Sequence, residues 1–136
     1  MANEAVCIET PTRFATYTIA DGTAIAIGTI MYLSSDPHTI LASSAADQPF
    51  AGIAWEEKTA SDGITRLTCA LDGIWDIKAT SASNVLGELV AIGGANLIVS
   101  ADAADLLNGA IIGYLEETQS ADEVSRVRLT KFGSSG

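Results

Sequence analysis

One pattern appears twice along this chain, and that repetition limits the folds it can adopt. GIAWEEKTASDGITRL covers residues 52–67, and GYLEETQSADEVSRV covers residues 113–127. At an offset of 60 the paired glutamates align, and so do Asp62 with Asp122, Ile64 with Val124, Arg66 with Arg126, and Leu67 with Val127. A unit repeated within one chain usually cannot bury its apolar face alone, and a second unit packed against it closes the core.

The segments that carry the pattern read as β-strands. Leu67, Cys69 and Leu71 alternate with polar or small residues, as expected for a strand with one buried face. Asp-Gly, Gly-Gly and Ser/Ala/Asp clusters separate short runs rich in Ile, Val, Thr and aromatic residues, which is typical of hairpins. The predicted strands lie within residues 23–33, 50–57, 64–77, 87–92, 96–100, 109–117 and 124–132.

The repeat therefore predicts a mainly β fold, a small β-sandwich or barrel built from two similar hairpin-rich halves. The two copies span about residues 28–71 and 87–131, and each begins at a glycine that precedes an apolar strand. At most one short helical turn is expected, within residues 100–109. There Ser100 or Asp102 is a candidate N-cap and Gly109 a candidate stop.

The chain divides into three parts on this interpretation. Residues 1–16 are polar, contain Pro11 and precede the first clear strand, so we expect an N-terminal arm. That arm is either a disordered terminus or a segment that becomes ordered only against a partner. Residues 17–132 form a single β-rich domain, and residues 133–136 form a flexible tail.

Charge excludes two classes of partner. The chain has 7 Lys plus Arg against 17 Asp plus Glu, a formal net charge of −10. Nucleic-acid binding depends on clustered cations, and anionic membrane surfaces attract basic segments, so neither nucleic acid nor membrane is expected as a partner. The first residues lack the cationic start and apolar run of a signal peptide, and the most apolar region is interrupted by aspartates.

Catalytic chemistry is not expected, so the chain is interpreted as a non-enzyme with no cofactor and no metal. Its one histidine, His38, follows Asp36-Pro37 and is predicted to be an exposed turn residue without a nucleophile motif. Adjacent glutamates on a strand point to opposite faces and cannot converge on one bond. Cys7 and Cys69 are predicted to be reduced, buried thiols, because no metal-ligand spacing accompanies them.

The remaining candidates are residues at a contact with another protein. Aromatic residues and arginine are enriched at such contacts, although a buried core Trp and a solvated surface Arg are the ordinary alternatives. Tyr32 and Phe132 are further candidates for a subunit contact, and Tyr114 for a ligand site. The predicted capsid or subunit interface comprises Cys7, Ile8, Pro11, Arg13, Phe14, Trp55, Arg66, Trp75, Arg126 and Arg128.

The strands also resemble a known family, the capsid decoration (cement, or head-stabilising) proteins of tailed double-stranded-DNA viruses. ALDGIWDI at residues 70–77 resembles the family's strand of Ala, Leu, an acidic residue, Gly and an aromatic. The resemblance covers about residues 17–130 in order, and its other segments are IADGTAIAIGTIMYL, FAGIAWEE, LGELVAIGGANLIVSA and IIGYLEETQSADEVSRVRL.

This resemblance implies a structural virion protein without an active site. Such proteins bind the outer surface of an assembled icosahedral capsid and stabilise it where major capsid protein subunits meet, commonly as homotrimers. The implied location is the capsid exterior, after synthesis in the host cytoplasm. Residues 1–16 extend beyond the family core and are the candidate for a segment that grips the capsid.

Two alternatives from other classes remain open at this stage. One is a β-sandwich module of a viral tail or cell surface that binds a receptor or glycan, with Trp55, Trp75 and Tyr114 gathered at one end. The other is a small hydrolase or lyase, which would require a carboxylate and a nucleophile beside His38.

Overall fold

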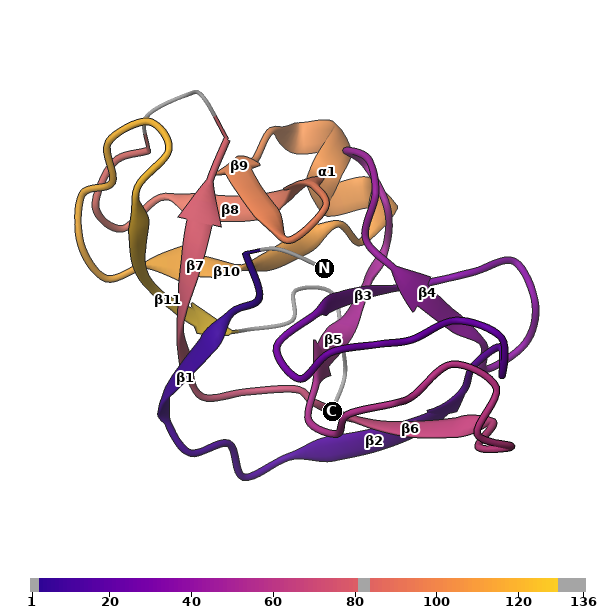
Figure 1. Cartoon of the computed structure of the whole chain (residues 1–136). Coiled ribbons are helices and arrows are strands. Elements are labelled where there is room, and N and C mark those ends of the chain that lie inside the picture. The colour runs from indigo at the N-terminus through magenta and orange to yellow at the C-terminus, as the bar shows by residue number, and fades with distance from the viewer. Residues whose placement is uncertain (1–2, 81–83, 130–136) are drawn as a thin grey trace.

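The computed structural model describes residues 3–80 and 84–129, and these residues form a mainly β fold with one short helix (Figure 1). The predicted fold class is therefore confirmed. The strands are β1 (Val6–Glu9), β2 (Phe14–Thr18), β3 (Ile30–Leu33), β4 (Ile40–Ala42), β5 (Phe50–Ala54), β6 (Arg66–Ala70), β7 (Ile74–Ala79), β8 (Leu89–Gly94), β9 (Leu97–Ser100), β10 (Ile111–Leu115) and β11 (Val124–Leu129), with helix α1 (Ala103–Asn108) between β9 and β10.

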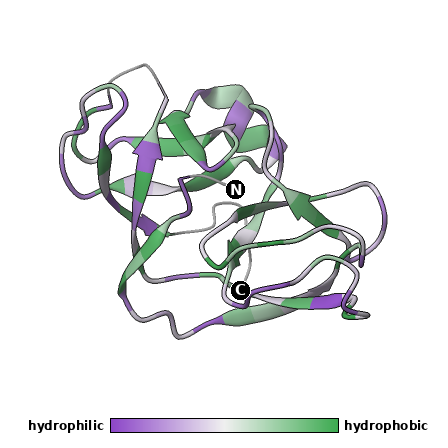
Figure 2. Ribbon diagram, in the orientation of Figure 1, coloured by the Kyte–Doolittle hydropathy of each residue, from purple (hydrophilic) through white to green (hydrophobic). Residues whose placement is uncertain are grey.

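The two halves of the chain form two lobes that lie side by side. The lobe of β7 to β11 occupies the upper left of Figure 1, and the lobe of β2 to β6 the lower right. Hydrophobic residues colour much of the strands of both lobes, and the connections are mostly pale with scattered hydrophilic stretches (Figure 2). We call these the first lobe (β2 to β6) and the second lobe (β7 to β11).

Both lobes have the same strand order. In the second lobe the order is β7-β11-β10-β8-β9, and β9 returns to pair with β7 in parallel, which closes the sheet into a small barrel. In the first lobe the order is β2-β6-β5-β3-β4, and a parallel bridge between Thr18 and Thr39 connects its two ends. The sheet of the first lobe thus closes in the same way as that of the second, but through one β-bridge rather than a pair of strands.

Equivalent hydrogen bonds show which residues correspond, and they correct the offset of 60. The Glu56 carboxylate accepts a hydrogen bond from the Thr68 N–H at 2.7 Å, and the Glu117 carboxylate accepts one from the Arg126 N–H at 3.1 Å. Glu56 therefore matches Glu117, and Thr68 matches Arg126. The sequence alignment was wrong by one residue in the first hairpin arm and by two in the second, because the turn after Asp62 is shorter in the second lobe.

The cores also differ from the expectation of one interior shared equally by two sheets. A cluster of eight buried residues lies wholly within the first lobe, from Ile19 to Cys69. The larger cluster contains the interior of the second lobe together with side chains of the first, among them Ile30, Phe50 and Ile53. Each lobe can bury its own apolar side chains because its sheet curves back on itself. At the junction between the lobes, side chains of the first lobe pack against the interior of the second lobe and enlarge its hydrophobic core.

The junction between the lobes is also held by hydrogen bonds to buried polar groups. Asn96, in the turn between β8 and β9, is fully buried, and its side-chain oxygen accepts a hydrogen bond from the Ile30 N–H at 2.8 Å. Its own N–H donates to the Ser43 hydroxyl at 3.0 Å, and the Phe50 N–H donates to the Gly109 carbonyl at 2.9 Å. These bonds fix the turn of the second lobe against β3 and β5 of the first.

The expectation of a separate N-terminal arm is wrong for the described residues of that segment. β1 pairs antiparallel with β7 of the second lobe, and β2 pairs antiparallel with β6 of the first. Asp72 accepts hydrogen bonds from the Thr12 and Arg13 N–H groups at 2.7 and 3.1 Å, which fixes the connection between these strands. The boundary at residue 16 divides β2, so the segment belongs to the fold. The tail at residues 133–136 lies outside the described residues.

Local structure agrees with the sequence at the helix and differs at one strand. α1 begins after the N-cap Asp102, whose side chain accepts a hydrogen bond from the Asp105 N–H, and ends at Gly109 in the left-handed conformation. The single strand predicted at residues 64–77 is instead two strands, β6 and β7. They belong to different lobes, because Gly73 adopts a φ of 96° between them and redirects the chain.

Candidate interaction surface

Three aromatic side chains from different strands form a continuous row. The ring centroids of Phe14 and Trp55 lie 5.5 Å apart, and those of Trp55 and Trp75 lie 6.0 Å apart in an edge-to-face arrangement. Such geometry lets the positive edge of one ring approach the negative face of the next. The row runs from the exposed Phe14 to the buried Trp75.

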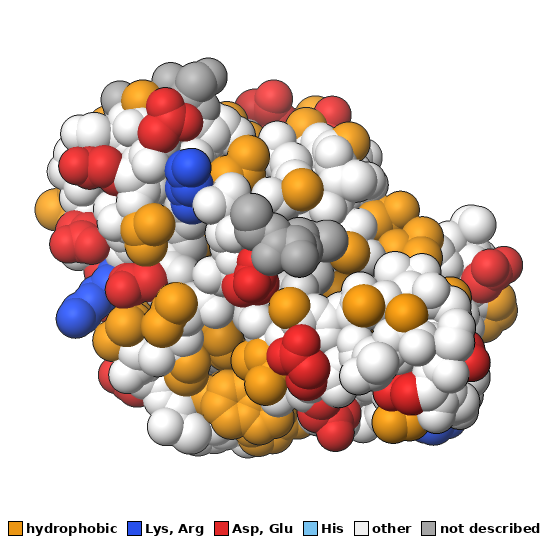
Figure 3. Space-filling view, in the orientation of Figure 1, with side chains coloured by type: hydrophobic (Ala, Val, Ile, Leu, Met, Phe, Trp, Pro, Cys, Tyr) orange, Lys and Arg blue, Asp and Glu red, His pale blue; other side chains and the backbone are white. Residues whose placement is uncertain are grey.

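The N-terminal strands also expose apolar side chains, two on β1 and one, Phe14, at the start of β2. Val6 is 59% exposed, Ile8 41% and Phe14 44%, and we call these three residues the apolar strip. Hydrophobic side chains gather over β1 and the start of β2 on the face shown in Figure 3. β1 is also an edge strand, since β7 is the one strand with which it pairs in the described chain. The strip therefore combines exposed apolar area with a free sheet edge.

Other predicted interface residues of the N-terminal segment are placed differently. Pro11 is buried, so its predicted contact with a partner is wrong for this conformation. Cys7 is half-buried opposite Trp75 in the β1–β7 pair, and burial raises the pKa of its thiol. Arg13 is exposed between the two strands.

The two tryptophans occupy different environments. Trp75 is 1% exposed, and its indole N–H donates to the Asp72 carbonyl at 3.1 Å, so it is a core residue and its predicted place at an interface is wrong. Trp55 is half-buried and links Trp75 to Phe14. Tyr114 lies on β10, and no ring contact joins it to either tryptophan among the described residues.

The three predicted arginines do not share one environment. Arg66 on β6 and Arg126 on β11 are exposed. Arg128 is half-buried, and its guanidinium Nε lies 2.9 Å from the Glu116 carboxylate, which raises the pKa of Arg128. Tyr32 is half-buried against the larger core, and Phe132 lies outside the described residues.

The two cysteines have no disulfide partner, as predicted. Cys69 is buried in the first lobe, and this burial raises the pKa of its thiol to about 12. The thiolate is the reactive form, so Cys69 is chemically inert at neutral pH. The expectation of a buried thiol is wrong for Cys7, which is half-buried on β1.

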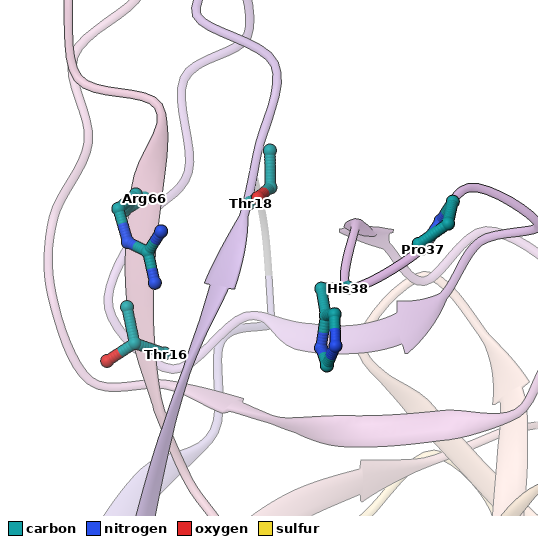
Figure 4. Close-up of a pocket in the computed structure, with 5 residues that line it drawn as sticks. All are labelled: Thr16, Thr18, Pro37, His38 and Arg66. Carbon is teal, nitrogen blue, oxygen red and sulfur yellow. The ribbon is translucent and has the colours of Figure 1, made fainter.

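His38 is exposed in a turn, as predicted, but the structure also places it beside residues that the sequence did not connect with it. A cavity of about 450 Å³ is lined by Thr16, Thr18, Pro37, His38 and Arg66 (Figure 4). These residues come from β2, β6 and the turn before β4. Antiparallel pairing places Thr18 directly opposite Arg66, a register that the sequence alone did not predict.

A second polar site missed by the sequence analysis lies inside the first lobe. The Lys58 side chain is fully buried, with its ammonium 3.0 Å from Asp21 and 2.6 Å from Asp62. Burial alone would lower the pKa of Lys58, but the hydrogen bonds to the two carboxylates raise it. The ammonium also donates to the Thr59 carbonyl at 3.0 Å, so all three of its N–H groups have partners. The Lys58 ammonium therefore has no N–H group left to bind a ligand.

The described residues contain no group of three or more His, Cys, Asp or Glu side chains arranged to hold a metal ion. Within the same residues, no helix has the length and apolar character needed to cross a membrane.

No protein-family model matches the sequence, and a search of curated proteins found no match either.

Proposed function

We propose that this protein is a structural virion protein that binds the outer surface of an assembled icosahedral capsid and stabilises the junctions between major capsid protein subunits. The observation that carries the proposal is the apolar strip of Val6, Ile8 and Phe14. It crosses the junction between the two lobes, because β1 lies on the second lobe and β2 on the first. The sequence resemblance to capsid decoration proteins supports the same function.

The physical chemistry of the strip suits a protein partner. Fully burying an exposed side chain of this size contributes about 1.5–3 kcal/mol, and roughly half of that remains for these three half-exposed side chains, so together they supply a modest affinity for each copy. The free edge of β1 offers backbone N–H and C=O groups to an added strand. Repetition of a modest contact over a symmetric shell makes the whole layer hard to remove.

Self-association belongs to the proposal. We propose that the protein acts as a homo-oligomer, with a trimer favoured. A trimer brings three copies of one surface to a single axis, where it would bind the surrounding capsid subunits together. Light scattering coupled to size-exclusion chromatography measures this state directly.

Co-sedimentation with capsids of the virus that encodes the protein tests the function. The wild-type chain should sediment with the capsids, and the double variant Ile8→Glu/Phe14→Glu should lose at least tenfold in apparent affinity. Leu107→Glu is the matched control, because Leu107 is 87% exposed on α1 and lies outside the apolar strip. Deletion of residues 1–16 is unsuitable, since it removes β1 and most of β2.

Two outcomes would contradict the proposal. One is equal loss of binding in the double variant and in the Leu107→Glu control, which would show a general effect of added charge. The other is binding to an immobilised glycan together with no binding to capsids, which would favour the receptor- or glycan-binding alternative.

A further inference from the structure

The cavity beside His38 has a chemical character unlike the rest of the molecule. Its lining contains an arginine, a histidine and two threonines, and it contains no carboxylate. The lining carries a positive charge, opposite in sign to the chain as a whole, which has 17 acidic residues and 7 basic ones. Figure 4 shows the Arg66 guanidinium on one side of Thr18 and the His38 ring on the other.

The main donor of this cavity, Arg66, is available to a ligand, and the Thr16 hydroxyl can keep its proton for a ligand if it accepts from the Thr68 hydroxyl, 3.1 Å away. Among the described residues, the Arg66 side chain forms no hydrogen bond and no ion pair, in contrast to Arg128 and Lys58. Arg66 and Thr18 face each other across β2 and β6, and Thr16 lies two residues along the same face. A guanidinium and hydroxyl groups on one sheet face present several N–H and O–H donors toward the same space.

The position of His38 is fixed by the backbone. Its φ of 53° is unusual for a residue other than glycine, and its carbonyl accepts a hydrogen bond from the Thr18 N–H at 2.7 Å. The Thr39 hydroxyl donates to the Pro37 carbonyl at 3.1 Å, and the Ser34 N–H donates to the Thr39 carbonyl at 2.9 Å. A turn fixed in this way holds the imidazole beside β2 before any ligand arrives, which lowers the entropic cost of binding.

The second lobe lacks this set of residues. The turn residue that corresponds to His38 is Asn96, because both adopt a left-handed conformation immediately before the residue that makes the parallel closing pair, Thr39 or Leu97. Asn96 is buried against the first lobe, whereas the matching turn in the first lobe faces solvent. Arg66 corresponds to Val124 by strand register. The cationic cavity is therefore particular to the first lobe and is not imposed by the repeated fold.

We propose that this cavity binds a carboxylate group, held by the Arg66 guanidinium with the Thr16 and Thr18 hydroxyls and the His38 imidazole as further donors. The planar fork of arginine matches a carboxylate with two parallel hydrogen bonds. One guanidinium balances one negative charge. A phosphate dianion would need more positive charge than this acidic chain supplies there. The carboxylate can come from an acidic side chain of a protein partner or from a small free acid, and the inference does not depend on the proposed function.

Nuclear magnetic resonance titration of the full chain, at constant ionic strength, tests the proposal. Acetate should shift the backbone amide signals of Thr16, Thr18, His38 and Arg66 in a saturable way, and acetamide, its neutral analogue, should bind at least tenfold more weakly. Arg66→Gln should weaken acetate binding at least tenfold, and Thr18→Val roughly threefold. Arg126→Gln is the matched control, because Arg126 is also exposed and lies on the other lobe.

The other outcomes of the titration decide where the carboxylate comes from and whether the site exists. A blocked Ala-Glu-Ala peptide that binds more tightly than acetate identifies a protein partner as the source, and equal affinity identifies a free acid. Both results support the site. Inorganic phosphate binding more tightly than acetate would overturn the assignment to a carboxylate. Signal changes spread over the surface, or equal weakening in Arg66→Gln and Arg126→Gln, would overturn the site itself.

Discussion

The two lobes have the same pattern of backbone hydrogen bonds, but at one equivalent buried position the first lobe has a charged side chain and the second a neutral one. In the first lobe, the backbone groups of Lys58 and Ile25 exchange hydrogen bonds at 2.8 and 3.0 Å. In the second lobe, Gln119 and Asn84 make the same exchange at 2.9 and 2.8 Å. Lys58 and Gln119 are therefore equivalent, and both are buried, at 1% and 0% exposed.

The partners of these two side chains explain how either residue is tolerated. Lys58 donates to Asp21, Asp62 and a backbone carbonyl. Gln119 donates to the Ile77 and Glu123 carbonyls at 3.0 and 2.9 Å, and its oxygen accepts from the Asn84 amide at 2.7 Å. The fold requires a hydrogen-bonding side chain that closes this end of each lobe. The neighbouring groups determine whether that side chain can be charged: two carboxylates suit an ammonium, and backbone carbonyls suit a neutral amide.

The largest expected effect concerns two equivalent glycines, Gly52 on β5 and Gly113 on β10. A Cβ at Gly113 would lie 2.0 Å from the Arg128 carbonyl oxygen, and one at Gly52 would lie 2.8 Å from the Ala70 carbonyl oxygen. Gly113→Ala should destabilise the protein by about 3 kcal/mol, because the backbone of β11 must move, and Gly52→Ala by about 2 kcal/mol. Chemical denaturation measures both. Equal stability of the two variants would show that the two strand pairs are equally tight.

The second prediction concerns replacing the buried Lys58 of the first lobe by glutamine, the residue found at the equivalent position 119 of the second lobe. Lys58→Gln should lower the midpoint of thermal unfolding by roughly 6 °C, because Asp21 and Asp62 lose their ammonium partner while the glutamine keeps two N–H donors. Adding Asp62→Asn should restore part of this loss, since one unpaired carboxylate is then removed. Calorimetry follows both variants. A stability for Lys58→Gln equal to wild type would mean that the lobe does not require the charge.

Acid should affect the charged lobe more than the neutral one. The hydrogen bond from Lys58 lowers the pKa of Asp62 below its ordinary value. A lowered carboxyl pKa contributes stability that is present above the unfolded-state pKa and is lost as pH falls below about 4. The raised pKa of Lys58 acts in the opposite direction, and its contribution is lost only at strongly alkaline pH.

Unfolding midpoints measured at pH 5 and pH 2.5 test this expectation. The midpoint of wild type should fall by roughly 3 °C more than that of Lys58→Gln over this interval. Asp72, whose carboxylate holds the Thr12 and Arg13 N–H groups, is unchanged in both proteins and adds the same acid sensitivity to each. Parallel pH dependence in the two proteins would show that the Lys58 site does not sense acid.

Much of the fold followed from residue chemistry that acts locally. Alternation in Leu67 and Cys69 predicted β6, and the Asp102 and Gly109 caps predicted α1, because caps and periodicity depend on neighbours along the chain. β1 and β2 were missed because their strand character comes from pairing with β7 and β6, far along the sequence. The break at Gly73 was missed for a similar reason, since a strand continues or turns according to what it packs against.

The candidate sites were predicted less well than the strands. The sequence identified Phe14, Trp55, His38 and Arg66 one by one, but not which of them meet, because contacts between distant strands depend on register. It also did not reveal that Lys58 is buried. A lysine beside Glu56 and Glu57 in the sequence reads as a surface residue, and its two carboxylate partners become apparent only in the folded lobe.

The smallest expected effect concerns the helix that distinguishes the second lobe. Asp102 caps α1 by accepting a hydrogen bond from the Asp105 N–H at 3.0 Å, and Asp102→Ala should cost about 0.5 kcal/mol, at the low end for an N-cap because α1 is short. In the first lobe the corresponding loop is held by Gln48, whose amide donates to the Ser44 hydroxyl at 3.0 Å. Ser44→Ala is the matched control and should change stability less, because Gln48 still accepts from the Ser44 and Ala45 N–H groups. If Ser44→Ala proved the costlier change in chemical denaturation, the loop of the first lobe, rather than α1, would be the more important of the two equivalent connections.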